Sequence, residues 1–323
     1  MKKQTIFVFL LLALFTSESF SQKSKKVIKT LIVDGQNNHM QWPKITVMIK
    51  QILEETGRFK VDVNRSKYTW EGEGFITKYP IEGLRPTVAL KKPKADSSFS
   101  PNFKKYDLII CNFGWNAAPW PAETQIAFEK YMKKGGALVV LHAADNSFPK
   151  WTAYNQMIGL GGWGDRTEKD GPYVYYNNEN QLIRDNSAGQ GGSHGPQHEF
   201  TIQIRDVDHP ITKGMPIKWL HTKDELYDRL RGPAEKMQVL ATTFSSKEMK
   251  GTGRHEPMMM TLNYGKGRIF HTPMGHIDYS IECVGFITSL LRGSEWAATG
   301  KVTFPIPADF PTENKTSSRV VLK

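Results

Sequence analysis

Three of the nine histidines in this 323-residue chain follow segments that read as buried β-strands, close to the point where each strand ends. Imidazole titrates near neutral pH and is the commonest metal ligand, so a histidine placed there can act as a general acid or base or bind a metal ion. One such histidine is more often a hydrogen-bonded structural residue. Three at strand exits favour a shared polar site, and they are His39, His142 and His276.

A carboxylate for the same site is available in the segment from His221 to Glu225. Its acids can serve as a general acid or base, as a ligand, or as the partner that orients a histidine. The alternative is the start of a helix, where the helix dipole favours acidic residues. We expect Glu225 to act in catalysis together with His142 and His276, and Asp224 to contact the substrate.

Polar and aromatic residues beside these histidines are candidate substrate contacts, because ligands of open α/β sheets bind outside the carboxyl ends of the strands. An indole face can stack on a sugar ring while amides and carboxylates hydrogen-bond the sugar hydroxyls. Besides Asp224, the predicted substrate-binding residues are Gln36, Asn37, His39, Trp115, Asn116, Asp145 and His198.

The histidines also allow a divalent metal ion, although the HExxH and CxxC motifs do not occur in the sequence. The candidate ligands are His39, His142, His198 and His276. The four-residue spacing of His194 and His198 suits a metal only on a helix, and Gly195-Pro196 argues against a helix there. The letters GxGxxG occur at 159–164, but they follow a predicted helix rather than a strand, so NAD binding is not supported.

The two cysteines, Cys111 and Cys283, are too few to form a disulfide framework. Both read as buried structural residues, and Cys283 is expected inside the last helix. Neither occupies the turn at His142, where related folds hold a nucleophile. Covalent thiol catalysis is therefore not supported.

Alternating strands and helices must position these residues. Strands that alternate with helices of ten to fifteen residues indicate an α/β fold, with a mostly parallel sheet and helices on both faces. We predict strands at 27–33, 59–63, 106–111 and 137–141, a helix carrying Ile45 to Leu53 with Pro43 in its first turn, and a helix carrying Ile126 to Met132.

Two long loop insertions interrupt this alternation, at 66–103 and 155–198. The second is rich in glycine and holds Trp163 and His194, so we expect an ordered wall of a pocket. Further along, we predict strands at 199–204, 237–244, 258–262 and 268–272, a hairpin at 264–267, and a final helix at 279–291 with Gly293 beyond its end.

The two ends of the chain differ from its body. The apolar run Ile6 to Phe15 behind Lys2 and Lys3 predicts a signal peptide over 1–21, and it is too short for the ~20 residues of a membrane span. No cysteine follows the run closely, so we expect a periplasmic or secreted protein without a lipid anchor. Of the formal charge of +11, Lys23, Lys25, Lys26 and Lys29 contribute +4 around a basic leader at 22–28. In the tail at 306–323, Lys315, Arg319 and Lys323 against Glu313 contribute +2, and the body of the chain keeps about +4. Such solvated ends are not the clustered face that nucleic acid requires.

Several motifs follow one another along the chain. They are LIVDGQNNH at 31–39, GGALVVLHAA at 135–144, HGPQHEF at 194–200, DHPITKG at 208–214, HTKDELY at 221–227, and GKGRIFH at 265–271 with Gly275 and His276. In this order they resemble the ThuA-like (trehalose utilisation) family, whose fold is similar to that of class I glutamine amidotransferases. The resemblance covers a domain at 29–305 and implies a flavodoxin-like sheet and a link to the use of glycosides or keto-sugars. The amidotransferase cysteine is missing at the turn, so glutamine hydrolysis is not implied.

We therefore expect an exported enzyme that acts on a glycoside or keto-sugar by histidine and glutamate acid–base chemistry, as a hydrolase, a lyase or an isomerase. The alternative is a sugar-binding protein that uses the same pocket without catalysis. A third hypothesis is an interaction module whose basic ends dock onto polyanions. We expect a small carbohydrate as the partner, with no nucleic acid and no stable insertion into a membrane, and the oligomeric state is left open.

Overall fold

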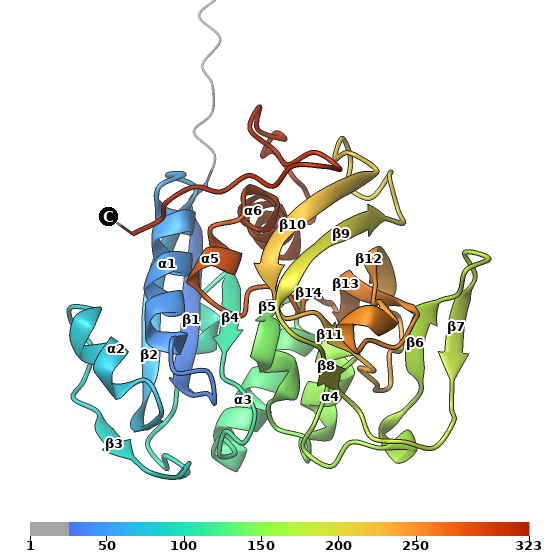
Figure 1. Ribbon diagram of the computed structural model, residues 1–323. Helices are drawn as coiled ribbons and strands as arrows, with labels where there is room; N and C mark the ends of the chain where they lie inside the picture. Colours follow the sequence, from blue (N-terminus) through green and yellow to red (C-terminus); the bar gives the residue numbers. More distant parts are fainter. Residues whose placement is uncertain (1–25, 323) are drawn as a thin grey trace, which may run out of the picture.

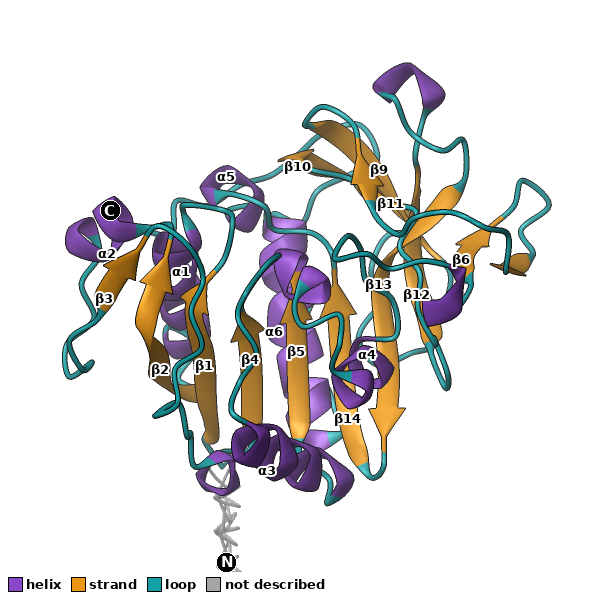
Figure 2. Ribbon diagram, turned by 90° about the horizontal axis from the view of Figure 1, so that it is seen from below, coloured by secondary structure: helices purple, strands orange, loops and turns teal. Residues whose placement is uncertain are grey.

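The computed structural model describes residues 26–322, and its core is one large β-sheet (Figures 1 and 2). Six strands of this sheet are parallel, in the order β3-β2-β1-β4-β5-β14. The order β2-β1-β4-β5-β14 is that of a flavodoxin-like sheet. The six strands are β1 (Ile28–Gln36), β2 (Phe59–Trp70), β3 (Val88–Leu90), β4 (Leu108–Asn112), β5 (Ala137–Leu141) and β14 (Gly267–Thr272).

Helices cover both faces of the parallel strands because side chains of each strand point alternately to either face. Ile28 and Ile32 of β1 pack with α1 and α6, whereas Leu31 and Val33 pack with α3 and α4. In Figure 2, α1 and α6 lie behind the strands. The predicted α/β fold class is thus confirmed. The helices are α1 (Trp42–Glu54), α3 (Ala122–Lys133), α4 (Thr152–Ile158) and α6 (Val284–Thr299).

Beyond β14 the sheet continues with antiparallel strands, which the sequence interpretation did not assign to one sheet. The order from β14 outward is β13 (His255–Tyr264), β12 (Gln238–Phe244), β9 (His198–Ile204) and β10 (Lys218–Asp224). Tyr264 pairs with Gly267 across the predicted hairpin. The alternative reading of the segment at His221, the start of a helix, is wrong, because His221 to Asp224 end strand β10, in which buried Trp219 and His221 alternate with less buried residues.

The two segments expected to be long loops contain short elements. Strand β2 runs on to Trp70, well past the predicted end at residue 63, because its second half pairs with β3. Within the two segments, the other short elements are α2 (Glu73–Lys78), β6 (Tyr173–Tyr176), β7 (Leu182–Asp185) and β8 (Ser193–His194). Two further short elements, β11 (Tyr227–Asp228) and α5 (Asp278–Ile281), lie outside them.

The prediction that Gly293 lies beyond the end of the final helix is wrong. Helix α6 continues to Thr299, and Gly300 in the left-handed region (φ 73°) ends it. Gly293 lies inside α6 because the helix packs closely on β14 at this point: a Cβ atom built on Gly293 would come within 2.1 Å of the Phe270 ring. Cys283, expected inside the helix, is its N-cap residue. Both cysteines are buried free thiols, as expected.

The C-terminal segment is not the solvated tail that its basic residues suggested. The Leu220 amide donates to the Thr312 carbonyl, and the Val284 amide donates to the Ser317 carbonyl. Val321 is buried in the core that α1 and α6 cover. The segment is therefore held by backbone hydrogen bonds and by Val321, while its described charged residues stay exposed.

The predicted signal peptide at 1–21 and most of the basic leader lie outside the described residues. Within residues 26–322, the helices are all too short or too polar to cross a membrane.

We predict that Gly293→Ala destabilises the protein by about 1–3 kcal/mol, because the added methyl group must displace the Phe270 ring in a tightly packed core. Helix propensity alone would favour alanine by about 1 kcal/mol. Gly74→Ala in α2 is the matched control, since a Cβ there meets nothing within 4 Å. Urea unfolding of both variants measures the difference, and equal midpoints would contradict the packing argument.

Candidate functional site

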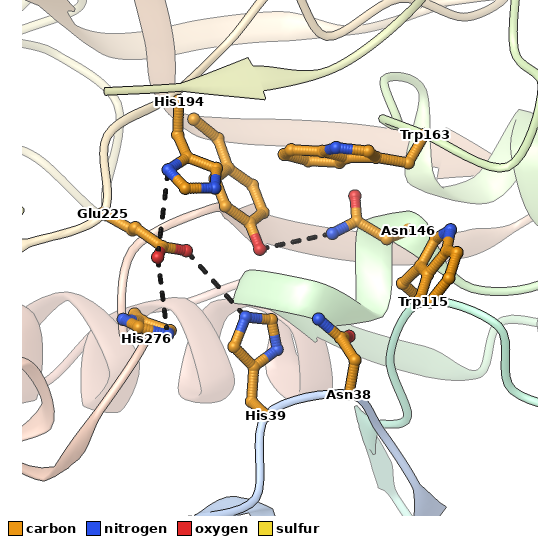
Figure 3. Close-up of a pocket in the computed structure, with 9 residues that line it drawn as sticks. Asn38, His39, Trp115, Asn146, Trp163, His194, Glu225 and His276 are labelled. Carbon is orange, nitrogen blue, oxygen red and sulfur yellow. Dashed lines mark hydrogen bonds and ion pairs between the residues drawn. The ribbon is translucent and has the colours of Figure 1, made fainter. Parts of the chain in front are cut away.

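Four side chains from distant parts of the chain meet at the carboxyl ends of the parallel strands, and Figure 3 shows three of them, His39, Glu225 and His276. His39 lies between β1 and α1, His142 follows β5 directly, and His276 follows β14. Glu225 comes from the turn between β10 and β11. One ligand atom from each of the four residues lies within 4.8 Å of the other three. The antiparallel half of the sheet thus brings a carboxylate to histidines held by the parallel half.

His142 follows β5 directly and is the first residue of the 3-10 helix His142–Asn146. Its backbone is strained, with φ at 37°. Such positive values are rare for residues other than glycine and concentrate at functional sites. Its Nδ1 lies 2.9 Å from the Pro273 carbonyl, which can only accept, so Nδ1 carries the proton. The buried Nε2 has no hydrogen-bond partner among the described residues and faces Glu225 at 3.9 Å.

The other histidine rings are also held through Nδ1. His39 Nδ1 and the His39 amide both lie 2.9 Å from Asn37 Oδ1, so this oxygen accepts from both and Nε2 faces Glu225. His276 Nδ1 lies 2.9 Å from the side-chain amide nitrogen of Gln197, whose oxygen accepts from the Tyr279 hydroxyl. Each ring is therefore fixed by a second residue behind it.

Four imidazole nitrogens surround the Glu225 carboxylate at distances too long for hydrogen bonds. The Nε2 atoms of His39, His142 and His276 lie 3.9, 3.9 and 3.7 Å from its oxygens, and His194 Nδ1 lies 3.8 Å away. The four imidazoles and the carboxylate therefore lie close together, but no imidazole forms a hydrogen bond with the carboxylate.

Burial favours the neutral form of two of these rings. Burial and the nearby His39 and His276 lower the pKa of His142 to about 3, and burial lowers the pKa of His276. Burial would raise the pKa of Glu225, but the surrounding histidines, His39 first, lower it to about 2. At neutral pH the imidazoles of His142 and His276 are thus neutral beside an ionised carboxylate.

The buried carboxylate of Asp224 fixes two members of this set. It accepts hydrogen bonds from the amides of Glu225, Gly275 and His276 at 2.8, 2.8 and 3.1 Å, and from His221 Nε2 at 2.8 Å. Burial opposes ionisation of Asp224, but the bond from His221 lowers its pKa to about 2. Asp224 therefore ties the turn after β10 to the loop after β14.

A cavity of about 370 Å³ opens above Glu225. The cavity is lined by two indole rings, two side-chain amides and one tyrosine ring, together with the Glu225 carboxylate and histidine rings (Figure 3). Its lining residues are Asn38, His39, Trp115, Asn146, Trp163, His194, Glu225, Tyr227 and His276.

A second cavity of about 440 Å³ shares Trp115 and Asn146 with the first. Its polar lining includes Asn116, Gln125, Lys150 and Asp165. Asn116 and Asp165 have φ values of 62° and 63°, and Trp163 in the first cavity has 53°. Strained backbone thus recurs along both cavities, as is common where a fold holds a ligand site.

The structure brings together His142, Glu225 and His276, the three residues predicted to be catalytic, with His39 and Trp115 beside them. Asn116 lines the second cavity, and Asn37 stands behind His39. The remaining predicted contacts lie outside the lining of the first cavity. They are Gln36, Asp145, Asp224 and His198.

Each of these four residues has a structural partner instead. Gln36 donates to the carbonyls of Tyr68 and Lys94, and Asp145 lies 3.4 Å from His271. His198 Nδ1 lies 2.8 Å from the Pro196 carbonyl, and the ring packs on Phe200, so His198 is not in the metal-compatible cluster.

Sequence interpretation did not include Asn38, Asn146, Trp163, His194 or Tyr227 among the site residues. Trp163 and His194 belong to the glycine-rich insertion that was expected to form a pocket wall, and this signal could have placed them. Tyr227 lies two residues after Glu225 in the same motif, HTKDELY, and this closeness in sequence could have placed it. No sequence signal separates Asn38 or Asn146 from ordinary loop residues.

This strand order defines a flavodoxin-like α/β protein, with a cavity at the carboxyl ends of its strands. The model of the ThuA family, described as trehalose utilisation, matches residues 83–297. The chain belongs to the ThuA family, which indicates a role in trehalose or other carbohydrate utilisation.

Two crystal structures extend the comparison. A protein described as ThuA-like from Parabacteroides merdae ATCC 43184 is 45% identical, with a TM-score of 0.81 over 92% of this chain and 99% of that chain. A second ThuA-like protein, from Bacteroides uniformis ATCC 8492, is 18% identical with a TM-score of 0.53 over 87% of this chain and 94% of its own, and it shows the shared fold alone. No curated protein matches the sequence significantly.

We predict that Asp224→Asn lowers the free energy of unfolding by about 3–5 kcal/mol, because it leaves the buried His221 without its anionic partner. Asp309→Asn is the control, since Asp309 pairs with Arg319 while both side chains are 47% exposed, and its effect should stay within about 1 kcal/mol. Denaturant unfolding followed by circular dichroism measures both. Equal losses would show that Asp224 is not an anchor.

Proposed function

We propose that this chain is an enzyme of carbohydrate utilisation and that the cavity above Glu225 is its active site. The observation that carries the proposal is the meeting of two indoles, two amides, an ionised carboxylate and several imidazoles in one cavity. Aromatic faces suit the C–H faces of a pyranose, and the amides suit its hydroxyls. Trp115 supports this role because 40% of it is exposed, far more than a packing tryptophan requires.

The chemistry that these groups favour is removal of a proton next to a carbonyl group. Ordinary glycosidases use a pair of carboxyl groups, whereas the lining of this cavity contributes one carboxylate, Glu225. Neutral imidazoles and an ionised carboxylate are bases. A keto-sugar supplies a carbon acid that such bases can deprotonate.

The proposed step begins when a base takes the proton from the carbon beside the ketone, and the electron pair moves onto the carbonyl oxygen. In a lyase, the returning electron pair expels the glycosidic oxygen on the next carbon, and this oxygen takes up a proton. In an isomerase, the hydroxyl of the deprotonated carbon gives its proton to the oxygen of the former ketone, and the first proton returns to the former carbonyl carbon, so that the carbonyl group moves by one position. The base and the proton donor come from the residues that line the cavity, His194, Glu225 and His276, whereas His142 is buried behind this lining.

His194 is suited to act as the base on the open side of the cavity. Its Nδ1 lies 2.9 Å from the Gly195 carbonyl, which can only accept, so Nδ1 carries the proton and Nε2 keeps its lone pair. Its side chain is 40% exposed, the highest value among the histidines around Glu225. A substrate can therefore reach it.

We also propose that the protein is exported, on the strength of the sequence Ile6 to Phe15 and the basic residues before it. Expression of the full chain in a bacterial host, followed by N-terminal sequencing of the periplasmic fraction, tests this. Cleavage near Ser21 is expected, and an uncleaved cytoplasmic chain would contradict it.

We predict that the wild-type protein turns over at least one member of a panel of trehalose, other disaccharides and their 3-keto forms. Glu225→Gln should lower kcat/KM at least about 100-fold, because it removes the carboxylate from the site. Glu313→Gln, an exposed substitution of the same kind, is the control and should leave the rate unchanged. Product formation is followed by mass spectrometry.

Binding of these sugars without turnover, at equal strength in the wild type and Glu225→Gln, would contradict the enzymatic proposal. It would favour the alternative of a sugar-binding protein that uses the same cavity.

We further predict that a disaccharide spans both cavities, with its second ring beside Trp115, Lys150 and Asp165. The double variant Lys150→Ala, Asp165→Ala should weaken disaccharide binding about 10-fold, as loss of hydrogen bonds to charged groups would, and leave glucose binding unchanged. Lys315→Ala is the control. Isothermal titration measures each affinity, and equal losses for both sugars would contradict a second ring site.

A further inference from the structure

We propose that His39, His142, Glu225 and His276 bind a divalent transition-metal ion at the floor of the cavity. Binding of the ion can be tested without any sugar, whereas its part in catalysis rests on the proposed function. The donor set consists of three imidazole nitrogens and one carboxylate oxygen. The HExxH and CxxC motifs, which would indicate a metal site, do not occur in the sequence.

The distances between the donor atoms suit one central ion. Donors that each lie about 2.1 Å from an ion lie roughly 3.0–3.6 Å from one another. The Nε2 atoms of His39, His142 and His276 lie 3.9, 3.9 and 3.7 Å from the nearest Glu225 oxygen. Because the four donor atoms lie within 4.8 Å of one another, the side chains would have to close in by up to about 1 Å to bind one ion. The distances to Glu225 are too long for hydrogen bonds, so direct pairing does not explain why the residues converge.

The buried Nε2 atom of His142 is a second, independent observation that favours a metal ion. The His142 side chain is only 6% exposed, and its Nε2 has no hydrogen-bond partner within residues 26–322. A buried polar atom without a partner costs about 1–3 kcal/mol. The strained backbone at φ 37° adds to the cost of holding this ring in place. A metal ion bound at Nε2 would offset both costs.

The residues behind the ligands have the arrangement of a metal site's outer shell. Ligating histidines donate their second ring N–H to a carbonyl or carboxylate, which fixes the tautomer that keeps a lone pair toward the ion. The Pro273 carbonyl does this for His142, and Asn37 Oδ1 does it for His39. Gln197 stands in the same place behind His276, where its amide oxygen accepts from Nδ1 once the amide turns by 180°.

Charge also favours a cation at this point. Glu225 is mostly buried, and within 4 Å its described ion-pair partners are imidazoles rather than lysine or arginine. A carboxylate withdrawn from water requires a positive partner. A divalent ion among neutral imidazoles would supply it.

The donor set selects the class of metal. Imidazole nitrogens suit Zn²⁺, Fe²⁺, Ni²⁺ and similar ions, whereas Mg²⁺ and Ca²⁺ prefer oxygen donors. His194, on the other side of Glu225 in Figure 3, is left free to contact substrate. When bound, the ion would polarise the carbonyl oxygen of a keto-sugar.

The test uses the full mature chain, freed of metal with a chelator and then titrated with Zn²⁺ alone in a calorimeter. We expect one ion per chain and a rise in Tm on binding. His142→Ala and Glu225→Gln should each weaken Zn²⁺ binding at least 100-fold. His198→Ala is the matched control, because His198 lies outside the donor set, and His194→Ala should also retain the ion. Circular dichroism checks that each variant is folded, and Glu225→Gln, which keeps the shape of the side chain, serves if His142→Ala does not fold.

Failure of the wild-type chain to bind Zn²⁺, Mn²⁺, Fe²⁺ or Ni²⁺, or equal binding by all variants, would overturn the metal site. Stoichiometric binding without sugar turnover would overturn the proposed function and leave the metal site standing. Turnover that survives complete metal removal would overturn the catalytic role of the ion.

Discussion

The carboxylate of Asp224 joins the two halves of this molecule at the point where its site forms. It accepts from the amides of Glu225 and His276, which belong to segments about fifty residues apart, and it pairs with the buried His221. Burial disfavours the charged ring of His221, but Cys283 and Asp224 outweigh this effect and raise the pKa of His221 to about 10. A protonated His221 and an ionised Asp224 thus hold each other in place below the site.

The parallel strands supply the rest of the positioning. Since β1, β5 and β14 end at one edge of the sheet, the residues that follow them are neighbours in space although they are far apart in sequence. The backbone then turns sharply at His142, and backbone or amide acceptors orient the rings. The result is a group of donor atoms that point at one another without pairing, beneath a cavity with aromatic walls.

How much of this the sequence predicts depends on how local each feature is. The parallel strands and the approach of His39, His142 and His276 follow from apolar runs and strand exits, which are local patterns. The antiparallel half is set by pairings between distant strands, so the sequence offers Glu225 as a candidate but does not fix its position. Gln36 and Asp145 occupy the same kind of place as His39, yet their side chains turn to structural partners. Gly293 looked like a helix end because nothing in the sequence shows its contact with Phe270.

The most direct measurement of the central claim is anomalous X-ray diffraction from crystals of the protein grown with Zn²⁺, recorded on both sides of the zinc absorption edge. The account predicts one strong anomalous peak about 2.0–2.2 Å from the Nε2 atoms of His39, His142 and His276 and from a Glu225 oxygen. Absence of a peak there, with the four side chains turned away from one another or linked by water, would contradict it.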